Sequence, residues 1–410
     1  MKTADPELMR AINRFHVLDA IRRNGSISRT EICAATELSS TTVSAITASL
    51  LEDGLIVTRA IGSIRTAQRG RPRVMLELNP DAARVVGVRL GPQRIVCVVT
   101  DFQGDVLADL AIPVRVERQT SVVIADLVED GVRRCVADAG LALGALSSVC
   151  VVLPGVTEHT TGTVRYSPIL RERDVPLGAA ISSRLDLPTL VESDSNAAAV
   201  AEHWFRRCRQ LDDFLVVTID HSLGLGVIHG GQLFRGAHGI SFHLGDLVVG
   251  GCGRDTTRLA DIASEAAILN TLLAEPDFAE AIRAGTGLTL ALQQQDAAEG
   301  RLQDAVARAG GALGIAIGNL ITLFAPALVV LTGSTLAFGA RLMEPLRAAL
   351  EVTLPPWLHG VATLVVDELD DTAWARGAAG VALRVLYGAP WGTTGPMTLN
   401  SPARAEAINA

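Results

Sequence analysis

Apolar residues near the start of the chain recur at the spacing of an amphipathic helix. This stripe consists of Ile12, Phe15, Val17, Leu18 and Ile21. Asn24-Gly25 follows the stripe directly, and such a pair commonly ends a helix. The pattern therefore predicts a first helix that ends at about residue 24.

Two shorter helices and a pair of strands are predicted next, over residues 29–35, 40–53, 55–60 and 73–78. Ser28 can cap the first of these helices, because a serine hydroxyl accepts hydrogen bonds from the backbone of the first turn. Ser39 or Ser40 can cap the second in the same way. Helices followed by a strand hairpin predict a winged helix-turn-helix domain over residues 7–80.

Beyond residue 80, short apolar runs alternate with helical patterns, which predicts an α/β fold. The expected strands cover 84–90, 95–101, 105–116, 147–153, 189–192, 214–219, 224–229, 327–332 and 361–366. The expected helices cover 121–140, 196–207, 256–274, 278–283, 303–324, 338–352 and 372–387. Each half opens with strand, turn and strand, so we expect two duplicated lobes, over 81–200 and 201–387, around a cleft. Residues 388–410, rich in Gly, Pro and Thr, are expected to form a flexible tail.

One long stretch, from Ala309 to Ala340, carries no charge and is long enough to cross a membrane. Residues that would break such a span interrupt it: Gly314, Gly318, Asn319, Pro326 and Gly333. We therefore expect a buried helix and strand here. The six cysteines show no C-x-x-C spacing, as expected of reduced thiols. The N-terminus also lacks the apolar region of a signal peptide. Both observations predict a cytoplasmic protein.

Charge is distributed unevenly along the chain. The whole sequence has a formal net charge of −8, but residues 1–80 carry +3 and residues 81–410 carry −11. A basic end on an acidic body indicates that the N-terminal domain is the part that meets a polyanion. Operator DNA is the partner expected for a winged helix-turn-helix.

The second helix of a helix-turn-helix lies in the major groove, where its N-terminal residues contact bases. In this chain the corresponding side chains carry hydroxyls: Ser40, Thr41, Thr42, Ser44 and Thr47. The helix has no Arg, Asn or Gln, so bidentate base recognition is missing. We expect DNA shape and the wing to contribute much of the specificity.

Arginines of the predicted wing are expected to supply much of the grip on DNA. They are Arg65, Arg69, Arg71 and Arg73, with Arg59 before them. The segment 69–73 can be extended and thin enough to enter the minor groove, where arginine is electrostatically favoured. Any one of these arginines would also fit a solvated surface, and a winged helix without a DNA-binding role is the alternative.

Several short motifs follow one another over nearly the whole chain: Gly70-Arg71-Pro72, Val85-Val86-Gly87-Val88, Gly104-Asp105-Val106-Leu107, Asp174-Val175-Pro176-Leu177, residues 192–202, residues 231–237 and Gly333-Ser334. In this order the chain resembles the ROK family of bacterial repressors and sugar kinases, in particular its xylose-operon-type regulators. The resemblance implies a winged helix-turn-helix followed by a two-lobed, actin-like fold of the sugar-kinase type.

The ATP-binding loops implied by the resemblance are altered. Family kinases hold phosphate on an Asp-x-Gly-x-Thr loop, but the matching segment reads Arg89-Leu90-Gly91-Pro92-Gln93. A cation replaces the carboxylate that would organise magnesium, and Pro92 removes a backbone N–H donor. In the second loop, a Gly-Thr-Gly pattern in the family, Gly224 and Gly226 remain. We expect no cofactor and no enzymatic activity.

Most polar residues of the family's sugar site are replaced as well. The family's Asn, Asn, Glu, His and later Glu correspond in order to Ile169, Ser193, His243, Asp246 and Ala260. Asp194 is kept and matches the family's general base, so it either contacts a ligand or caps the following helix. The candidate ligand-binding residues are therefore Ser193, Asp194, His243 and Asp246.

The family's structural zinc needs one His and three closely spaced Cys, because four donors must converge tetrahedrally. The matching segment keeps Cys252, and Asp246 stands at the His position. We expect a loop without metal; a site improvised from His238, His243 and Cys252 is the alternative.

These observations predict a DNA-binding transcriptional regulator of the repressor type. It would act as a homodimer or tetramer, without a membrane partner, and would respond to a sugar or related metabolite between its lobes. One alternative is a regulator whose body serves oligomerisation alone. A second alternative is an active carbohydrate kinase, supported by Asp194 and the glycines of the second loop.

Overall fold

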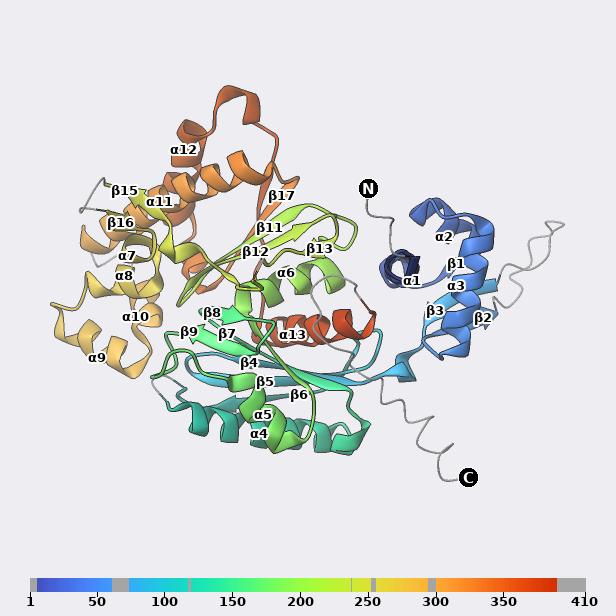
Figure 1. Cartoon of the computed structure of the whole chain (residues 1–410). Helices are drawn as coiled ribbons and strands as arrows, with labels where there is room; N and C mark the ends of the chain where they lie inside the picture. Colours follow the sequence, from blue (N-terminus) through green and yellow to red (C-terminus); the bar gives the residue numbers. More distant parts are fainter. Residues whose placement is uncertain are drawn as a thin grey trace.

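The computed structural model describes residues 6–60, 74–116, 119–236, 238–251, 256–293 and 300–388. These residues form a small N-terminal head and a larger body of two α/β lobes (Figure 1). The head lies beside the body, and its first helix is the part nearest to the body in this view (Figure 1).

The head is a winged helix-turn-helix. Its elements are α1 (Pro6–Asn24), β1 (Ile27–Ser28), α2 (Arg29–Thr36), α3 (Ser40–Glu52), β2 (Ile56–Ala60) and β3 (Val74–Leu78). The strands form an antiparallel sheet in the order β1-β3-β2. Ser28 caps α2 in a reciprocal capping box with Glu31, and Ser39, the first of the two proposed caps, caps α3. The predicted helices and wing strands are confirmed within two residues.

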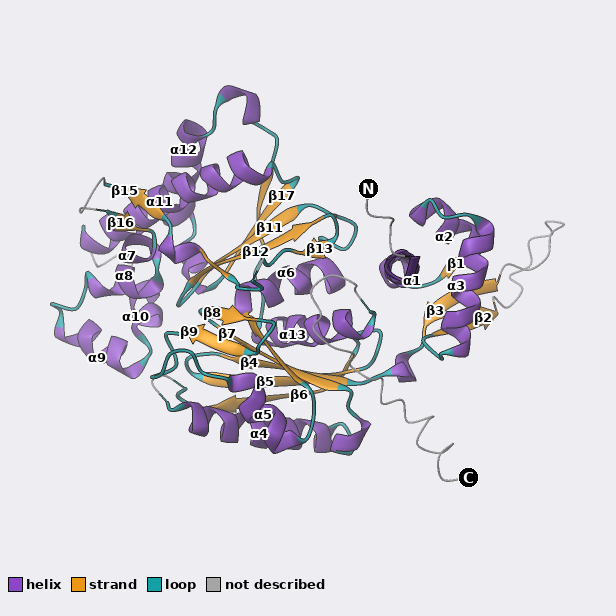
Figure 2. Ribbon diagram, in the orientation of Figure 1, coloured by secondary structure: helices purple, strands orange, loops and turns teal. Residues whose placement is uncertain are grey.

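The first lobe is built on a five-stranded sheet in the order β10-β7-β4-β5-β6. Its strands are β4 (Val85–Leu90), β5 (Arg94–Thr100), β6 (Val106–Pro113), β7 (Ser148–Leu153) and β10 (Thr189–Ser193). β10, β7 and β4 run parallel, and β7 and β4 are rich in valine, as expected of strands covered on both faces. Helices α4 (Ser121–Asp138) and α5 (Leu177–Leu185) pack on the outer face (Figure 2). The hairpin β8 (Val156–Glu158) and β9 (Thr163–Tyr166) lies at the end of the sheet, where β8 contacts β10 and Glu158 forms a bridge with Ile240 of the second lobe.

The second lobe repeats this topology with the order β13-β12-β11-β17-β18. Its strands are β11 (Phe214–Ile219), β12 (Leu223–His229), β13 (Gln232–Leu233), β17 (Leu328–Thr332) and β18 (Thr363–Val366), and β14 (Phe242–His243) pairs with β12. In each lobe an antiparallel strand pair is followed by two parallel strands, so the expected duplication is confirmed.

Helices of the second lobe cover its outer face. They are α7 (Ala260–Ala263), α8 (Glu265–Asn270), α9 (Pro276–Ala284), α10 (Gly287–Gln293), α11 (Arg301–Phe324) and α12 (Ala340–Thr353), with the short strands β15 (Val248–Gly250) and β16 (Thr257–Arg258). The single helix predicted over 256–274 is wrong: Ser264, in extended conformation, ends α7 and caps α8. α11 is long and apolar enough to span a membrane, but its buried face packs into the core of this lobe.

Two helices fill the space between the sheets: α6 (Asp194–Phe205) and α13 (Asp371–Leu386) (Figure 2). A Cβ on Gly377 of α13 would lie 2.2 Å from the Ala197 carbonyl of α6, so glycine permits the close approach. The same holds for Gly226 of β12 against Ser195 of α6. α13 also packs on β4, so this helix belongs to the first lobe although it follows the second lobe in the sequence. A boundary at residue 200 therefore does not separate the two lobes.

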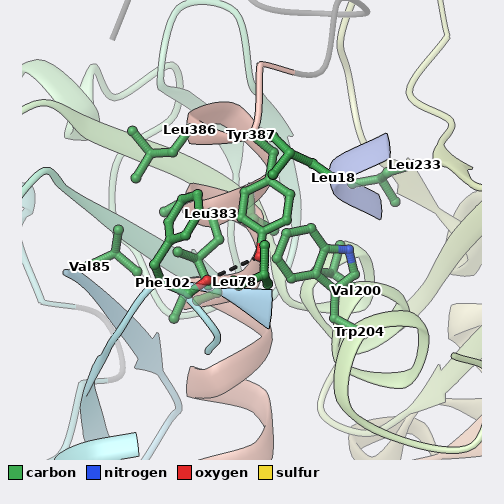
Figure 3. Close-up of a cluster of buried hydrophobic side chains, with 14 of the residues drawn as sticks. Leu18, Leu78, Val85, Phe102, Val200, Trp204, Leu233, Leu383, Leu386 and Tyr387 are labelled. Atoms are coloured by element: carbon green, nitrogen blue, oxygen red, sulfur yellow. Dashed lines mark hydrogen bonds between the residues drawn. The ribbon is translucent and has the colours of Figure 1, made fainter. Parts of the chain in front are cut away.

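The core of the head continues into the body. Leu18 of α1 lies in the same buried cluster as Trp204 of α6 and Tyr387 after α13 (Figure 3). The Tyr387 hydroxyl donates to the Phe102 carbonyl at 3.0 Å, and Phe102 follows β5 in the first lobe. Head and body are therefore joined by packed apolar side chains in addition to the covalent connection.

Candidate nucleic-acid interface and interlobe cleft

The N-terminal turn of α3 presents small hydroxyl side chains to solvent. The Ser39 hydroxyl accepts from the Thr42 N–H at 3.1 Å and thereby fixes the start of the helix. Ser40, Thr41 and Ser44 are exposed, and Thr42 is half-buried. Ala45 and Ala48, which the sequence analysis did not select, extend the exposed face at the spacing of a helix. The apolar positions Val43 and Leu50 are buried in the head.

Thr47 lies on the other side of α3, which corrects one predicted DNA contact. Its side chain is fully buried; its hydroxyl accepts from Nε of Arg29 at 2.9 Å and lies 3.2 Å from the Ser44 carbonyl. A buried and already bonded hydroxyl cannot reach a base edge in this arrangement. Thr47 instead ties α2 to α3, and the helical period counted from Val43 would have placed it inside.

The wing arginines Arg65, Arg69, Arg71 and Arg73 lie outside the described residues, so their role remains a prediction. Arg59 on β2 is described. Its side chain is 73% exposed and pairs with Glu77 of β3 at 3.1 Å.

The cleft between the lobes contains an arginine where family kinases carry a carboxylate. The guanidinium of Arg89, at the end of β4, pairs with Asp371 at the start of α13 and lies 3.3 Å from Asp220 at the end of β11. It also lies over the Trp374 ring, 4.4 Å from the centroid. Arg89 therefore links the first lobe to the second.

Beside Arg89 the cleft opens into a cavity of about 650 Å³. Carboxylates dominate its charged lining, which comprises Asp220, Glu265, Glu368 and Asp371 with the arginines Arg89 and Arg94. The Ser334 hydroxyl lies 2.6 Å from Oδ1 of Asp220 and 2.9 Å from Oε2 of Glu265. Sequence reasoning had identified Arg89 and Gly333-Ser334 here; the acidic residues come from separate elements and carried no motif.

Ser193 and Asp194 lie at the N-terminus of α6. Ser193 is its N-cap and accepts from the Asn196 N–H at 3.3 Å. Asp194 is the first helical residue, is 6% exposed, and accepts from the Ser195 N–H at 2.7 Å. Burial raises the pKa of Asp194 to about 6; Arg89 opposes this shift and Asp220 adds to it. The cap of α6 is therefore Ser193, not Asp194.

His243 and Asp246 form a second, separate pair. Nδ1 of His243 lies 3.0 Å from Oδ2 of Asp246. The other carboxylate oxygen of Asp246, Oδ1, pairs with Arg258 at 3.3 Å. Among the described residues, no hydrogen bond or ion pair joins this pair to Ser193 or Asp194, and none of these four residues lines the 650 Å³ cavity.

Glu192, directly before Ser193, is fully buried in a polar network that sequence reasoning did not single out. It accepts from Nε of Arg235 at 2.6 Å and from Nδ2 of Asn196 at 2.8 Å. Burial would raise the pKa of Glu192, but Arg235 and His159 lower it below its usual value. This network holds the β10–α6 junction. The described residues contain no group of three His, Cys, Asp or Glu placed to bind a metal, and Cys252 lies outside them.

Comparison with known proteins agrees with this architecture. Residues 85–385 match the ROK family model, and residues 10–57 match a winged helix-turn-helix DNA-binding model. The chain belongs to the ROK family. The N-terminal DNA-binding domain ahead of the ROK body is the arrangement of a transcriptional regulator.

Relatives of this ROK protein include the xylose repressor of Caldicellulosiruptor bescii, 28% identical over 360 residues that cover 84% of this chain and 88% of the relative. A crystallised ROK family transcriptional regulator, homologous to the Escherichia coli MLC protein, covers 93% of this chain and 98% of its own at a TM-score of 0.72 and 24% identity. A ROK glucokinase of Streptomyces griseus, solved with glucose and AMPPNP, covers 73% of this chain and 99% of its own at a TM-score of 0.58 and 23% identity.

Proposed function

We propose that this ROK protein is a cytoplasmic transcriptional repressor whose body senses a small metabolite and transmits its binding to the DNA-binding head. The observation that supports this proposal is that a single helix, α6, begins beside the cleft, where Asp194 interacts electrostatically with Arg89 and Asp220, and ends at the head. Its first residue is Asp194, and its last turn is bound by Arg22 of α1. With twelve residues, α6 spans about 18 Å.

Arg22 caps the C-terminal end of α6. Its side chain is 2% exposed, and Nη1 lies 3.3 Å from the carbonyl oxygens of His203 and Trp204. The last carbonyls of a helix lack partners within the helix, and a cation there is favoured by the helix dipole. A shift or rotation of α6 would therefore move the acceptors of Arg22 and change the position of the head.

The cavity beside Arg89 supports a sensing role better than catalysis. Carboxylates around it would repel the phosphates of ATP, and Arg89 occupies the place of a metal-organising carboxylate. Hydroxyl groups or an amine on a ligand would find acceptors on Asp220 and Glu265. A sugar or an amino derivative is therefore the proposed effector class, and the chain acts without enzymatic turnover.

Repression further requires two heads on one operator, because helix-turn-helix proteins read two half-sites about one helical turn apart. We propose a homodimer or a tetramer. The exposed hydroxyls and methyls of α3 would face the major groove, with the wing arginines on the neighbouring backbone or minor groove.

Selection of genomic fragments by the purified full-length chain, followed by sequencing, tests this proposal. A few discrete sites should be enriched. Thr41→Glu should abolish the enrichment, because a carboxylate on exposed α3 would face phosphates, whereas Thr161→Glu on the exposed surface of the body should leave it unchanged. Uniform recovery of all fragments by the unaltered chain would contradict a regulator.

A ligand-independent regulator is the competing function, because the predicted sugar-site residues fall into two unconnected pairs. Thermal unfolding of the full-length chain with a panel of sugars and amino sugars separates the two. A saturable rise in melting temperature for one compound, reduced by Asp220→Asn, supports the sensor; no response to any compound supports the competitor. ATP turnover on the same panel would support the kinase alternative.

A further inference from the structure

A cluster of cationic and N–H-bearing side chains lies where the head meets the body. Arg22 and Arg23 come from α1, His203 and Trp204 from the end of α6, and Arg384 from the last turn of α13. All except Arg23 are at least 94% buried. The cluster therefore lies on the seam between three helices, away from the interlobe cavity.

The carboxylates of this seam form ion pairs with the two arginines of the head. Asp19 pairs with Arg22 at 2.8 Å and with Arg23 at 2.7 Å, and Asp212 pairs with Arg23 at 2.6 Å. Two carboxylates thus balance two guanidinium groups. Arg384 is left over: no described residue forms an ion pair with it, and its polar partner is Oε1 of Gln232 at 2.7 Å.

Three buried N–H groups of this seam have neither a hydrogen-bond acceptor nor an ion-pair partner: Nη1 of Arg384, Nε1 of Trp204 and Nδ1 of His203. Nη2 of Arg22 also lacks a hydrogen bond, but it lies 2.8 Å from Oδ1 of Asp19 in an ion pair. The assignment for His203 follows from its other nitrogen. Nε2 lies 3.2 Å from Nη2 of Arg23, which can only donate, so Nε2 is the acceptor and Nδ1 carries the proton.

We propose that this seam binds one small monovalent anion, of which chloride is the simplest. The anion would be held by the charge of Arg384 and by the N–H groups of His203 and Trp204. All three of the unpartnered atoms are donors, and the uncompensated charge is positive, so both the hydrogen-bonding capacity and the charge favour an anion. Water could accept from the N–H groups, but it could not neutralise Arg384, and a buried charge without a counterion is costly.

The surrounding electrostatics agree with this site. Burial lowers the pKa of the Arg384 guanidinium to about 9; Arg235 and Arg22 act in the same direction and Asp19 opposes them. Burial likewise lowers the pKa of His203 well below its usual value, with Arg22 and Arg384 adding to the shift. His203 is therefore neutral and contributes a dipole. The buried charge without a counterion is the one on Arg384; Arg209, which donates to the Arg22 carbonyl, adds a second cation that is partly exposed.

An anion at this place would hold the head to the body, because two of its ligands, both from the body, contact arginines of the head. Trp204 lies under the Arg22 guanidinium at 4.7 Å, and His203 contacts Arg23. This inference goes beyond the regulator proposed above and does not depend on it, since its test uses the chain without DNA or effector.

Thermal unfolding of the full-length chain at constant ionic strength, with potassium gluconate replaced stepwise by potassium chloride, tests the site. Chloride should raise the melting temperature saturably, by about 2 °C for each tenfold increase above its dissociation constant. Bromide should act like chloride. Acetate tests whether the site prefers a carboxylate to a halide. If it does, acetate should raise the melting temperature at a lower concentration than chloride does.

Arg384→Met should abolish the difference between chloride and gluconate, because it removes the charge and keeps the length of the side chain. Arg376→Met is the matched control on the same helix; its guanidinium pairs with Asp105 at 3.3 Å and is 30% exposed, so the chloride response should persist. If Arg384→Met does not fold, Trp204→Phe, which removes one N–H, should weaken the response. The proposal is overturned if the unaltered chain melts equally in chloride and gluconate, or if Arg384→Met retains the full response.

Discussion

The ionised carboxylate of Asp194 destabilises the folded chain near neutral pH, because burial disfavours the charge. With a folded pKa of about 6 against an ordinary value of 3.8, it binds its proton more tightly in the folded state, so stability falls as the pH rises between about 4 and 6. Asp194→Asn removes this cost and keeps the oxygen that accepts from Ser195. It should therefore raise the free energy of unfolding at pH 7.5 by up to about 3 kcal/mol.

Denaturant unfolding of both chains from pH 4.5 to 8 checks this prediction. The advantage of Asp194→Asn should shrink toward the acidic end, because Asp194 is then protonated in the folded state and neither folded chain carries a charge at this position. An equal difference at every pH would show that ionisation of Asp194 does not limit stability.

For single residues, the sequence predicted whether a side chain is exposed better than it predicted which partners that side chain binds. The hydroxyls at the start of α3 are exposed as expected, because caps and helical period are local properties. Thr47 was predicted on the exposed face, although it lies one helical turn after the buried Val43; its bond to Arg29 of another helix could not be predicted from the local pattern. Asp220 and Asp371 were missed because their pairing with Arg89 joins residues more than a hundred positions apart.

Among the elements, α11 and α12 approach each other along a glycine stripe. A Cβ on Gly314 would lie 2.3 Å from the Leu346 carbonyl, and one on Gly310 would lie 2.3 Å from that of Leu342. Gly314→Ala should therefore force the helices apart and lower the free energy of unfolding by about 1–3 kcal/mol. Gly311→Ala is the matched control: its Cβ would meet open space, so the helix should gain about 0.5–1 kcal/mol.

Chemical denaturation of the two alanine variants measures both effects under one set of conditions. An equal change in the free energy of unfolding for both substitutions would mean that the close approach to α12 does not distinguish Gly314 from Gly311.

Element prediction succeeded where the apolar pattern was long and regular. The strand pairs that open each lobe and the helix α11 were predicted from their patterns alone. The helix expected over 256–274 failed because the break at Ser264 depends on a cap within a continuous helical pattern. That α13 returns to the first lobe is a property of the tertiary fold, and no local pattern encodes it.

In the whole molecule, Asp19 is the carboxylate that allows two arginines of the head to be buried against the body. Burial would raise its pKa, but Arg22 and Arg23 lower it to about 2, so its contribution is complete above about pH 4 and is lost as the pH falls toward 2. Asp19→Asn should lower the free energy of unfolding at pH 7 by about 3–5 kcal/mol, because it leaves buried cations unpaired.

Hydrogen exchange should show where this stability is lost. Amides of α1 and of the last turn of α6 should exchange faster in Asp19→Asn, because the joint between them has opened. Asp53→Asn is the control in the same head; it breaks an exposed pair with Arg14 and should cost less than about 1 kcal/mol, with α1–α6 exchange unchanged. If the α1 amides of Asp19→Asn keep their protection from hydrogen exchange, the contact between α1 and α6 does not couple the head to the body.

Binding of DNA by the head is the central claim, and an affinity ratio tests it most directly. The full-length chain would be titrated with a duplex recovered in the genomic selection and with a shuffled duplex of the same composition, at two salt concentrations. We predict affinity at least about a thousandfold higher for the selected duplex, and weaker binding to both duplexes at the higher salt concentration. Equal affinity for the two duplexes would contradict the account.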